Sequence, residues 1–502
     1  MDVRIHDILT RNARLEPDRI AATLGEERRT FGELDERANR AAHRLAAEGV
    51  AHRDRVVWWG PTDLAALEVC YGVTRAGGAL APVNPAFGEQ EAAAALTELR
   101  PRLVVAHPDC EDAARAVATP LGLGVVVTGP DWLQGAATTV LPRVGDAEDT
   151  CTVFLTSGST GVSKAAELSH RASWLRAVAR EHQTGAPGVA GEVVMFGYFH
   201  MAGWWMTEHA WAVDRPAHLV HRADADELLW AVDRWQASSL YCIPAVWERI
   251  LDAGGGADAS RRGGSLRGRS LKEVLTGTSR VDLALVGALR DRFPGAWMSV
   301  AYGSTEIGRG AVLVDSDIEA RPGSVGLPPP AVDACIDADG ELLLRGPTMF
   351  TGYLGRPDAT AAAIDADGWY HTGDLATADG DGSLTITGRR SEGIRSGGEW
   401  IAPVEVETAV RTHPAVADVG VVGLPDPQWG EVVCAAIVPR PGMEVPTVDE
   451  LRAHVAPMLV GPKQPRVVVE VAHVPRTDAT GQIRRAHLQR RLVAGAGGGG
   501  SA

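Results

Sequence analysis

Helical and strand patterns alternate along most of this chain of 502 residues. Segments with apolar residues at helical spacing are separated by short, continuous apolar runs. The helical segments are 31–49, 63–76 and 90–99, and the runs are 55–59, 79–83 and 103–106. Strands separated by helices assemble into layered α/β folds with mainly parallel sheets. The sequence therefore predicts a large α/β domain with mostly parallel sheets over residues 1–389.

A second domain is expected because a chain of 53.0 kDa is too long for a single hydrophobic core. Beyond residue 390 the pattern changes to a compact mixture of helices and strands. The expected helices are 404–411 and 448–459, and the expected strands are 418–422, 432–438 and 467–471. We expect a small α+β domain at 390–493 and a disordered Gly/Ala tail at 494–502.

Charge and composition exclude several classes of protein. The formal net charge of −15 argues against a nucleic-acid-binding protein, which would carry a basic face. No apolar run has the roughly 20 residues that a transmembrane helix needs, and the N-terminus lacks an apolar signal core. The six cysteines are scattered, without the paired spacing of a metal or redox site. These features predict a cytoplasmic protein whose anion sites must be built locally.

A loop of hydroxyls and glycines follows the apolar run 151–155. It reads Thr156-Ser157-Gly158-Ser159-Thr160-Gly161-Val162-Ser163-Lys164. Glycines let backbone N–H groups turn inward, hydroxyls donate hydrogen bonds, and the lysine adds a positive charge, so the loop suits a polyanion. The residue order of the Walker loop is absent. Taken alone, the loop fits a phosphate site and a solvated Ser/Gly turn about equally well.

Three further motifs occur downstream in a fixed order. They are Tyr302-Gly303-Ser304-Thr305-Glu306, then Tyr370-His371-Thr372-Gly373-Asp374, then Gly388-Arg389 followed by Ser396-Gly397-Gly398-Glu399. Together with the first loop, they resemble the adenylate-forming superfamily from about residue 31 to residue 481. Within that superfamily the chain looks most like a bacterial acyl-CoA synthetase, because 340–347 with Gly352-Tyr353 and 423–426 with 429–431 are typical there.

The resemblance implies a site for ATP and Mg²⁺. The residues that would hold ATP are Thr156, Ser157, Gly158, Ser159, Thr160, Gly161, Lys164, Gly277, Thr278, Ser279, Tyr302, Gly303, Ser304, Thr305, Asp374 and Arg389. In this set Tyr302 would face the adenine, Asp374 would bind the ribose hydroxyls and Thr305 would contact the α-phosphate. Glu306 and Thr160 would be the metal ligands, since Mg²⁺ prefers hard oxygen donors.

The resemblance also implies sites for an acid and a thiol. The acid would contact His200, Gly203, Trp204, Trp205 and Gly303, with His200 as a gate beside the carboxylate. Large rings leave little room for a long tail, so a short or aromatic acid is expected if Trp204 or Trp205 faces the tunnel. The alternative is that both indoles are ordinary core rings. Ser396, Gly397 and Gly398 would border the thiol channel.

Two departures from the superfamily pattern concern the C-terminal domain, which the resemblance implies is mobile about a hinge at Arg390 and Ser391. The hinge acid or lysine is replaced by Ser391, and Gln482 stands where a catalytic lysine is expected. Loss of one charged donor to a transition-state oxyanion typically costs ~2.7–4 kcal/mol. Arg484 is a candidate substitute. The expected catalytic set is Lys164, His200, Thr305, Glu306, Arg389 and Gln482.

The predicted activity has two steps. A carboxylate is activated by ATP as an acyl adenylate and is then transferred to a thiol, which we expect to be that of coenzyme A. One alternative is transfer of a small unusual acid, even nitrite, to a carrier protein or an amine. An alternative of another class is a nucleotide-binding protein whose catalysis is impaired by Gln482.

Overall fold

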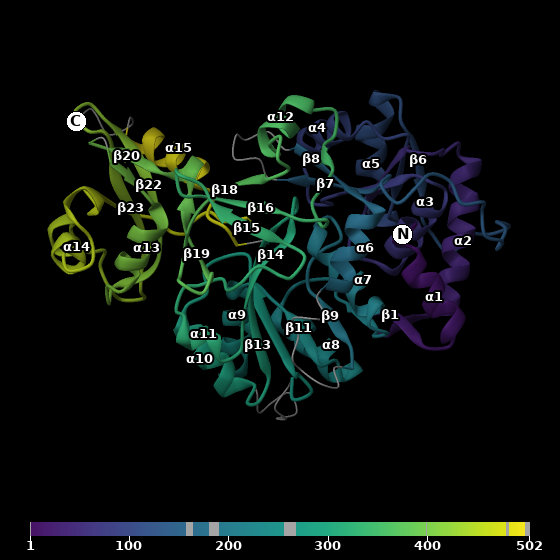
Figure 1. The fold of residues 1–502 in the computed structure, drawn as a ribbon, viewed down its shortest axis with the longest axis horizontal. Helices are drawn as coiled ribbons and strands as arrows, with labels where there is room; N and C mark the ends of the chain where they lie inside the picture. Colours follow the sequence, from purple (N-terminus) through teal and green to yellow (C-terminus); the bar gives the residue numbers. More distant parts are fainter. Residues whose placement is uncertain are drawn as a thin grey trace. The chain divides into compact units, whose positions relative to one another are not determined.

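The computed structural model describes residues 2–156, 164–179, 190–255, 268–397, 399–477 and 481–496. The chain divides into two compact units. The first unit comprises Met1–Ala334 with Leu344–Tyr370, and the second comprises Cys335–Leu343 with His371–Ala502. Each unit is described by itself below (Figure 1).

Two large sheets form the frame of the first unit. In sheet order the first has β14 (Gly308–Val314), β13 (Trp297–Ser304), β12 (Glu273–Gly277), β11 (Ser239–Tyr241), β9 (Glu192–Val194), β10 (Ala217–Leu219), β1 (Ile20–Leu24) and β2 (Glu27–Thr30). The second has β17 (Gly352–Tyr353), β8 (Lys164–Ser169), β7 (Thr150–Thr156), β4 (Ala79–Val83), β3 (Arg55–Trp59), β5 (Leu103–Ala106) and β6 (Gly124–Val127). The inner pairings are parallel, and antiparallel pairings occur toward the edges, at β1/β2, β13/β14, β7/β8 and β8/β17.

Helices cover both faces of each sheet. The helices between the sheets are α3 (Leu64–Arg75), α6 (His170–Ala179) and α7 (Met201–Ala212). On the outer faces are α4 (Glu89–Leu99), α5 (Glu111–Ala118), α8 (Ala225–Trp235), α9 (Pro244–Gly255) and α10 (Leu283–Arg292). The remaining helices are α1 (Asp7–Leu15), α2 (Phe31–Ala47), α11 (Asp317–Ala320) and α12 (Pro357–Ala363). Because α6 contacts β7, β8 and α7, while α7 contacts β9, the two sheets are joined through this helix pair (Figure 1).

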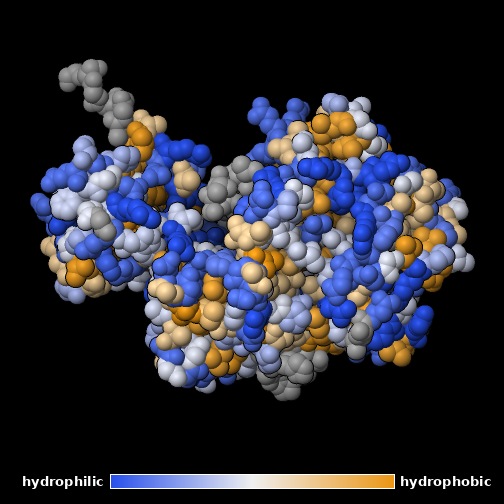
Figure 2. Space-filling model, turned by 45° about the horizontal axis from the view of Figure 1, so that its top comes forward, coloured by the Kyte–Doolittle hydropathy of each residue, from blue (hydrophilic) through white to orange (hydrophobic). Residues whose placement is uncertain are grey.

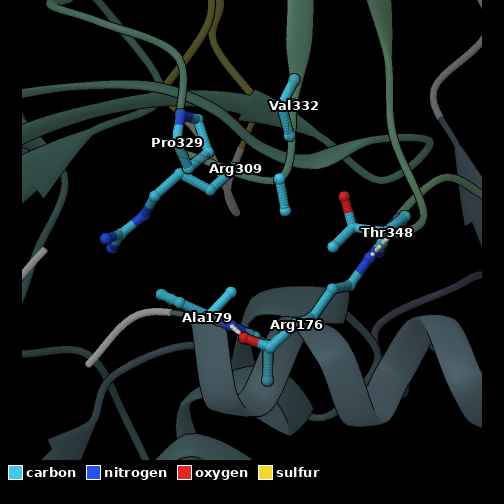
Figure 3. A pocket seen from close by; sticks show the side chains of 8 residues that line it. Arg176, Ala179, Arg309, Pro329, Val332 and Thr348 are labelled. Carbon is cyan, nitrogen blue, oxygen red and sulfur yellow. Dashed lines mark hydrogen bonds between the residues drawn. The ribbon is translucent and has the colours of Figure 1, made fainter. Parts of the chain in front are cut away.

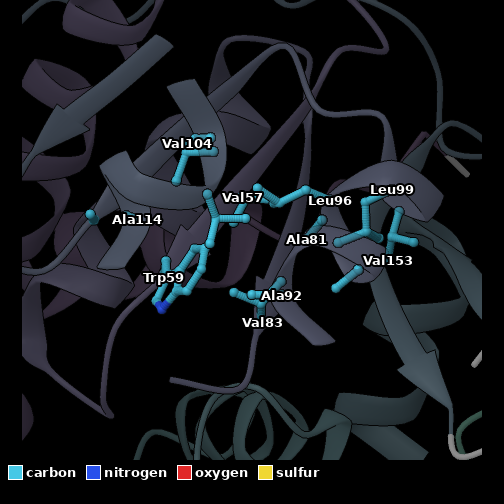
Figure 4. Close-up of a cluster of buried hydrophobic side chains, with 14 of the residues drawn as sticks. Val57, Trp59, Ala81, Val83, Ala92, Leu96, Leu99, Val104, Ala114 and Val153 are labelled. Carbon is cyan, nitrogen blue, oxygen red and sulfur yellow. The ribbon is translucent and has the colours of Figure 1, made fainter. Parts of the chain in front are cut away.

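Burial on both faces explains the apolar runs of the seven-stranded sheet. Successive side chains of a strand point to opposite faces, and strands covered on both sides lack polar alternation. Val57 and Trp59 of β3 pack with Ala92 and Leu96 of α4 in one buried cluster (Figure 4). Val56 and Trp58, which alternate with them, are also fully buried. The strands at 55–59, 79–83 and 103–106 therefore lie where the sequence predicts them.

The second unit contains two smaller sheets. One has the order β15 (Asp333–Ile336), β16 (Glu341–Arg345), β18 (Tyr370–Ala378) and β19 (Leu384–Arg389), and its strands lie mainly in this unit. The other has β21 (Glu399–Ile401), β20 (Ile394–Ser396), β23 (Gly430–Pro439) and β22 (Val416–Asp426), with β24 (Val467–Glu470) also paired to β23. The helices are α13 (Pro403–Arg411), α14 (Val448–Val455) and α15 (Arg485–Ala496).

Alternation along β22 and β23 places helices on both faces of the second sheet. Val421 and Val433 belong to the core formed with α13 and α14. Val422 and Cys434, one position further along each strand, pack with Leu488 of α15. The predicted α/β fold, with mostly parallel sheets and a small α+β domain, is confirmed.

Three local predictions differ from the structure or cannot be compared with it. β8 is a strand that the sequence analysis did not anticipate between the glycine-rich loop and α6, which begins at His170. Helix α15 extends to Ala496, so the first residues of the segment predicted to be disordered are helical, whereas 497–502 lie outside the described residues. The segment 254–269, whose Gly, Ser and Arg content predicts a mobile surface loop, also lies mostly outside them, at 256–267.

The surface shows no large uniform apolar face in the view of Figure 2, where hydrophobic residues form scattered groups among hydrophilic ones. Among the described helices, none combines the length and the apolar character needed to cross a bilayer.

Candidate active site

The predicted site residues of the first unit follow the carboxyl ends of strands. β12 ends at Gly277 and β13 ends at Ser304, while the segment after β9 leads to His200. β12 and β13 are parallel neighbours, so their carboxyl ends share one edge of the eight-stranded sheet. Ligands of open α/β sheets bind in crevices at such edges, which is where the fold places these residues.

The phosphate loop connects two antiparallel strands. Thr156 ends β7 and pairs with Lys164, the first residue of β8, and the Thr156 hydroxyl donates to the Lys164 carbonyl over 3.2 Å. The residues between them include five predicted ATP-binding residues that lie outside the described part of the chain: Ser157, Gly158, Ser159, Thr160 and Gly161.

The Glu306 side chain is enclosed, with 8% of the residue exposed. The Tyr353 hydroxyl donates to its Oε1 over 2.9 Å, and the Phe350 amide donates to its carbonyl over 2.6 Å. Its own amide donates to the Ser304 hydroxyl over 3.2 Å. On the other side of Tyr353, the Lys164 ammonium lies 4.8 Å from the ring centroid. Tyr353 therefore contacts the predicted metal ligand and the predicted phosphate lysine at once.

Arg176 of α6 fixes the backbone of the same turn. Its guanidinium donates to the carbonyls of Thr305 over 3.0 Å, Glu306 over 3.1 Å and Thr348 over 2.8 Å. Burial lowers the pKa of Arg176 to about 10, so the side chain remains charged at neutral pH. Gly308 lies beside it with φ of 76°, a conformation that favours glycine, and a Cβ there would lie 3.0 Å from the Arg176 Nε.

The sequence analysis did not assign functions to Tyr353 or Arg176. Gly352-Tyr353 was visible as a superfamily-typical pair, so a signal existed for the tyrosine. No such signal marked Arg176 in the sequence, because an arginine within a helical segment is usually a solvated surface residue.

The predicted adenine loop has unusual backbone geometry. A Cβ at Gly277 would lie 2.1 Å from the Ala301 carbonyl oxygen. Thr278, next to it, has φ of 66°, a left-handed conformation that is rare and strained for a β-branched residue. Gly303 lies opposite Arg309 across β13 and β14, and a Cβ there would lie 2.0 Å from the Gly308 carbonyl oxygen. Close backbone packing accounts for both glycines.

His200 begins the helix that carries the predicted acid-binding residues. It is the N-cap of α7, where its Nδ1 accepts from the Ala202 amide over 3.1 Å, and its ring stacks on Phe196 with centroids 5.4 Å apart. Burial lowers the pKa of His200 to about 4, so the imidazole is neutral at pH 7. Gly203 allows the first turn to approach Phe196, whose carbonyl oxygen would lie 2.6 Å from a Cβ.

The two adjacent tryptophans have different environments. Trp204 is 2% exposed, stacks on Tyr198 at 4.1 Å and donates to the Tyr198 carbonyl over 2.6 Å, as a core ring does. Trp205 donates to the Arg176 carbonyl over 2.8 Å, and the Arg309 guanidinium lies 5.2 Å from its ring. Only Trp205 of this pair belongs to the lining of a small cavity in the described part of the first unit.

This cavity is mainly apolar. Figure 3 shows Arg176 and Ala179 projecting from one helix, with Pro329 and Val332 across the space from them. Thr348 lines one side, and its hydroxyl has no hydrogen-bond partner among the described residues. The cavity therefore suits a compact apolar group with at most a small polar substituent.

In the second unit, two predicted site residues form an ion pair. Asp374 of β18 lies opposite Arg389 of β19, and the Arg389 Nε is 2.8 Å from the Asp374 Oδ1. Asp374 is 5% exposed. The pair holds the carboxylate in a defined orientation at the edge of the four-stranded sheet.

The predicted hinge lies between two anchored residues. The Arg390 guanidinium donates to Glu341 over 3.1 Å and Asp339 over 3.0 Å, next to β16. Glu392 pairs with Arg485 of α15 over 2.6 Å. Ser391 is exposed between them. Rotation at Ser391 would leave both sets of contacts intact.

The predicted thiol-channel loop and terminal motif complete the second unit. Ser396 is buried in β20, and Gly398 lies outside the described residues. Gly397 has φ of 60°, and a Cβ there would lie 2.7 Å from the Trp429 ring. Gln482 is half-buried, and its backbone amide donates to the Thr477 hydroxyl over 3.1 Å. Arg484 is exposed just before α15.

Comparison with known proteins identifies the family. The AMP-binding enzyme family matches residues 9–354, and the AMP-binding enzyme C-terminal domain matches residues 405–480. A feruloyl-CoA synthase of an Amycolatopsis species is 31% identical over 495 residues, covering 96% of this chain and 98% of its own. An indoleacetate–CoA ligase of Aromatoleum aromaticum is 31% identical over 523 residues, covering 98% of each chain.

The fold is also that of solved structures in this family. An o-succinylbenzoate coenzyme A synthetase from Bacillus subtilis, in complex with ATP and magnesium ion, superposes with a TM-score of 0.84 at 23% identity, covering 96% of this chain and 98% of its own. The family models match parts of both units, at residues 9–354 and 405–480. The chain therefore belongs to the AMP-binding, adenylate-forming enzyme family, and within it to the AMP-forming acid–CoA ligases.

Proposed function

We propose that this protein activates a compact aromatic or short carboxylic acid with ATP and transfers the acyl group to coenzyme A in the cytoplasm. The carboxylate oxygen attacks the α-phosphorus and pyrophosphate leaves, which gives an acyl adenylate. The thiol sulfur then attacks the acyl carbon and AMP leaves. The observation that carries the proposal is the enclosed Glu306 beside Lys164, with Tyr353 in contact with both.

The residues of the first unit divide the work of adenylation. Lys164 binds the phosphates together with the loop that begins at Thr156. Thr305, fixed through its carbonyl by Arg176, contacts the α-phosphate. Tyr302 and the strained turn after Gly277 form the adenine pocket. His200, neutral at pH 7, flanks the acid carboxylate without repelling or neutralising it.

The second unit supplies the ribose contact and the thiol path. Asp374 accepts hydrogen bonds from the ribose hydroxyls, and Arg389, already paired with it, binds the ribose or a phosphate. The small domain turns at Arg390 and Ser391 between the two steps. Ser396, Gly397 and Gly398 then border the thiol channel.

The donor set at Glu306 fits Mg²⁺. One oxygen of this enclosed carboxylate is fixed by the Tyr353 hydroxyl, which leaves the other available as a hard ligand. Thr160 is the second proposed protein ligand. When bound, the ion neutralises charge on the triphosphate and the departing pyrophosphate.

Trp205 supports the proposed size of the acid. Its indole lies in the cavity lining with Val332 and Thr348, where an alkyl tail of a long fatty acid would need space. Trp204, by contrast, is engaged with Tyr198 and supports the fold.

Gln482 favours a second candidate function, that of a nucleotide-binding protein with impaired catalysis. ATP–pyrophosphate exchange across a panel of carboxylic acids separates the two. Exchange with aromatic acids and the formation of their CoA thioesters are expected, whereas tight ATP binding without exchange for any acid would favour the second candidate. A product formed only with a carrier protein or an amine would change the acceptor.

Two variants test the assignment of the site. Lys164→Ala and Glu306→Gln should each lower the rate of adenylate formation by at least about 10²-fold, the usual effect of removing one charge-stabilising group. Their melting temperatures should stay close to that of the wild type. Near-normal pyrophosphate release by both variants would overturn the assignment.

A further inference from the structure

Tyr353 occupies a position between two oppositely charged side chains. Its hydroxyl donates to the Glu306 Oε1 over 2.9 Å, and its ring lies beneath the Lys164 ammonium at 4.8 Å. The residue is 8% exposed and packs edge-to-face against Phe350, with ring centroids 4.9 Å apart. The ring therefore cannot turn away from either charged group without disturbing the packing around it.

Each contact restrains a different group. A hydrogen bond to one oxygen of a carboxylate fixes its plane and directs the other oxygen to a metal ion. An ammonium over an aromatic face is attracted to the ring, which limits the positions of a flexible lysine. Both side chains meet the triphosphate in the proposed function, one directly and one through Mg²⁺.

We propose that Tyr353 is a positioning residue that presets the metal ligand Glu306 with its hydroxyl and the phosphate lysine Lys164 with its ring. The inference rests on the proposed function, because it requires that these two residues meet the metal and the phosphates. It assigns to the tyrosine no contact with the reacting atoms.

Other groups hold the backbone at Glu306, so the role proposed for Tyr353 can be distinguished from general structural support. Arg176 and the Phe350 amide hold the Glu306 backbone through its carbonyl oxygen. Loss of the Tyr353 hydroxyl therefore leaves the backbone of the turn fixed and releases the carboxylate alone. Tyr353→Phe keeps the ring over Lys164, whereas Tyr353→Leu removes both contacts.

The experiment measures binding without turnover. Binding of Mn²⁺ to the enzyme–ATP complex is followed by electron paramagnetic resonance, and binding of metal-free ATP is followed by calorimetry. Tyr353→Phe should weaken Mn²⁺ binding by roughly 10- to 100-fold and leave metal-free ATP binding unchanged. Tyr353→Leu should in addition weaken metal-free ATP binding by about two- to five-fold.

A matched control is Tyr198→Phe, which removes another buried tyrosine hydroxyl, one that bonds Thr207 and contacts neither charged group. It should change neither measurement. Combining Tyr353→Phe with Glu306→Gln should add no further loss of Mn²⁺ binding, since the hydroxyl acts through the carboxylate. Additive losses in the double variant would overturn the proposal.

The outcomes also separate this inference from the proposed function. If Glu306→Gln itself leaves Mn²⁺ binding unchanged, the metal assignment is wrong. If Glu306→Gln weakens binding but Tyr353→Phe matches the wild type, the metal assignment stands and the role of Tyr353 is wrong. Tighter metal-free ATP binding by Tyr353→Leu would show that the ring withholds the lysine from phosphate, which also overturns the proposal.

Discussion

Two predicted catalytic residues, one in each unit, differ in charge and in how they are held. In the first unit the Glu306 carboxylate is surrounded by fixed partners, whereas in the second unit the terminal motif has a neutral glutamine where a catalytic lysine is expected. Glu306 is held by Tyr353, Phe350 and Arg176. Gln482 brings no charge, and the partly buried Arg485 nearby pairs with Glu392 and Glu407. The difference is one of charge: charged and hydrogen-bonded groups fix Glu306, whereas position 482 supplies no charge and leaves Arg389 as the proposed phosphate or ribose ligand of the second unit.

The variant Gln482→Lys removes this difference most directly, because it places a positive charge in the terminal motif. Adenylation concentrates negative charge on the α-phosphate and the attacking carboxylate, so a lysine should speed that half-reaction by roughly 10²-fold or more. Thioester formation from a preformed adenylate uses another domain orientation and should barely change. Single-turnover kinetics of each half-reaction measures both rates.

Arg484→Ala is the companion variant, because Arg484 is the exposed cation two residues away. If Gln482→Lys leaves adenylation unchanged while Arg484→Ala abolishes it, the charge has been relocated to Arg484. If neither variant alters either rate, the terminal motif does not control the chemistry.

The variant Ser391→Pro tests the proposed hinge, which lies within the second unit. Proline restricts its own φ and the conformation of Arg390 before it, while the anchors at Glu341 and Glu392 remain in place. One of the two half-reactions, adenylation or thioester formation, should be slowed by about 10- to 10²-fold more than the other, since small misplacements of reacting groups have effects of that size. Equal slowing of both half-reactions would argue against a hinge at Ser391, and Ser391→Ala is the control.

Sequence reasoning found the strands that are apolar on both faces. The run 103–106 matches β5 residue for residue, since every position of that strand is buried. β8 was missed because the polar residues Lys164 and Glu167 interrupt its apolar positions, and pairing with β7 holds it in the sheet. Its assignment depends on a partner strand, which a local pattern does not reveal.

The site shows the same division between local and distant information. Motif residues such as Glu306 and Asp374 are visible because their neighbours in sequence form a recognisable order. Tyr353 and Arg176 act on Glu306 from positions 47 and 130 residues away. Only the fold brings them together. The fold alone also shows that the adjacent Trp204 and Trp205 have different environments.

The variant Trp205→Ala sharpens the comparison within the first unit, between a ring that lines the cavity and its neighbour that does not. Removing this indole should raise kcat/KM for longer acids relative to short ones by roughly 10-fold or more. Trp204→Phe is the matched control, and it should lower the melting temperature without changing the order of preferred acids. A wild-type preference for acids of long alkyl chain would contradict the prediction, as would an unchanged preference in Trp205→Ala.

Substitution of Glu208 in α7 should have the smallest effect on activity but a measurable effect on stability. Burial raises the pKa of Glu208 from its ordinary value of 4.5 to about 8, although the charge of Arg176 acts in the opposite direction. The folded protein therefore holds a proton that the unfolded chain has lost between these two values. By linkage, the stability contributed by the protonated carboxyl is fully present below pH 4.5 and is lost as the pH rises toward 8.

Glu208→Gln keeps the shape of the protonated acid and removes its titration. The difference in free energy of unfolding between variant and wild type should be small near pH 5, should grow by about 1.4 kcal/mol for each pH unit in which the wild type alone loses its proton on unfolding, and should level off above pH 8. Urea denaturation at pH 5, 7 and 9 measures it. A variant less stable than the wild type at pH 9 would mean that Arg176 stabilises the ionised Glu208 carboxylate more than burial penalises it. The surroundings of Glu208 would then resemble the charged surroundings of Glu306 rather than a neutral core.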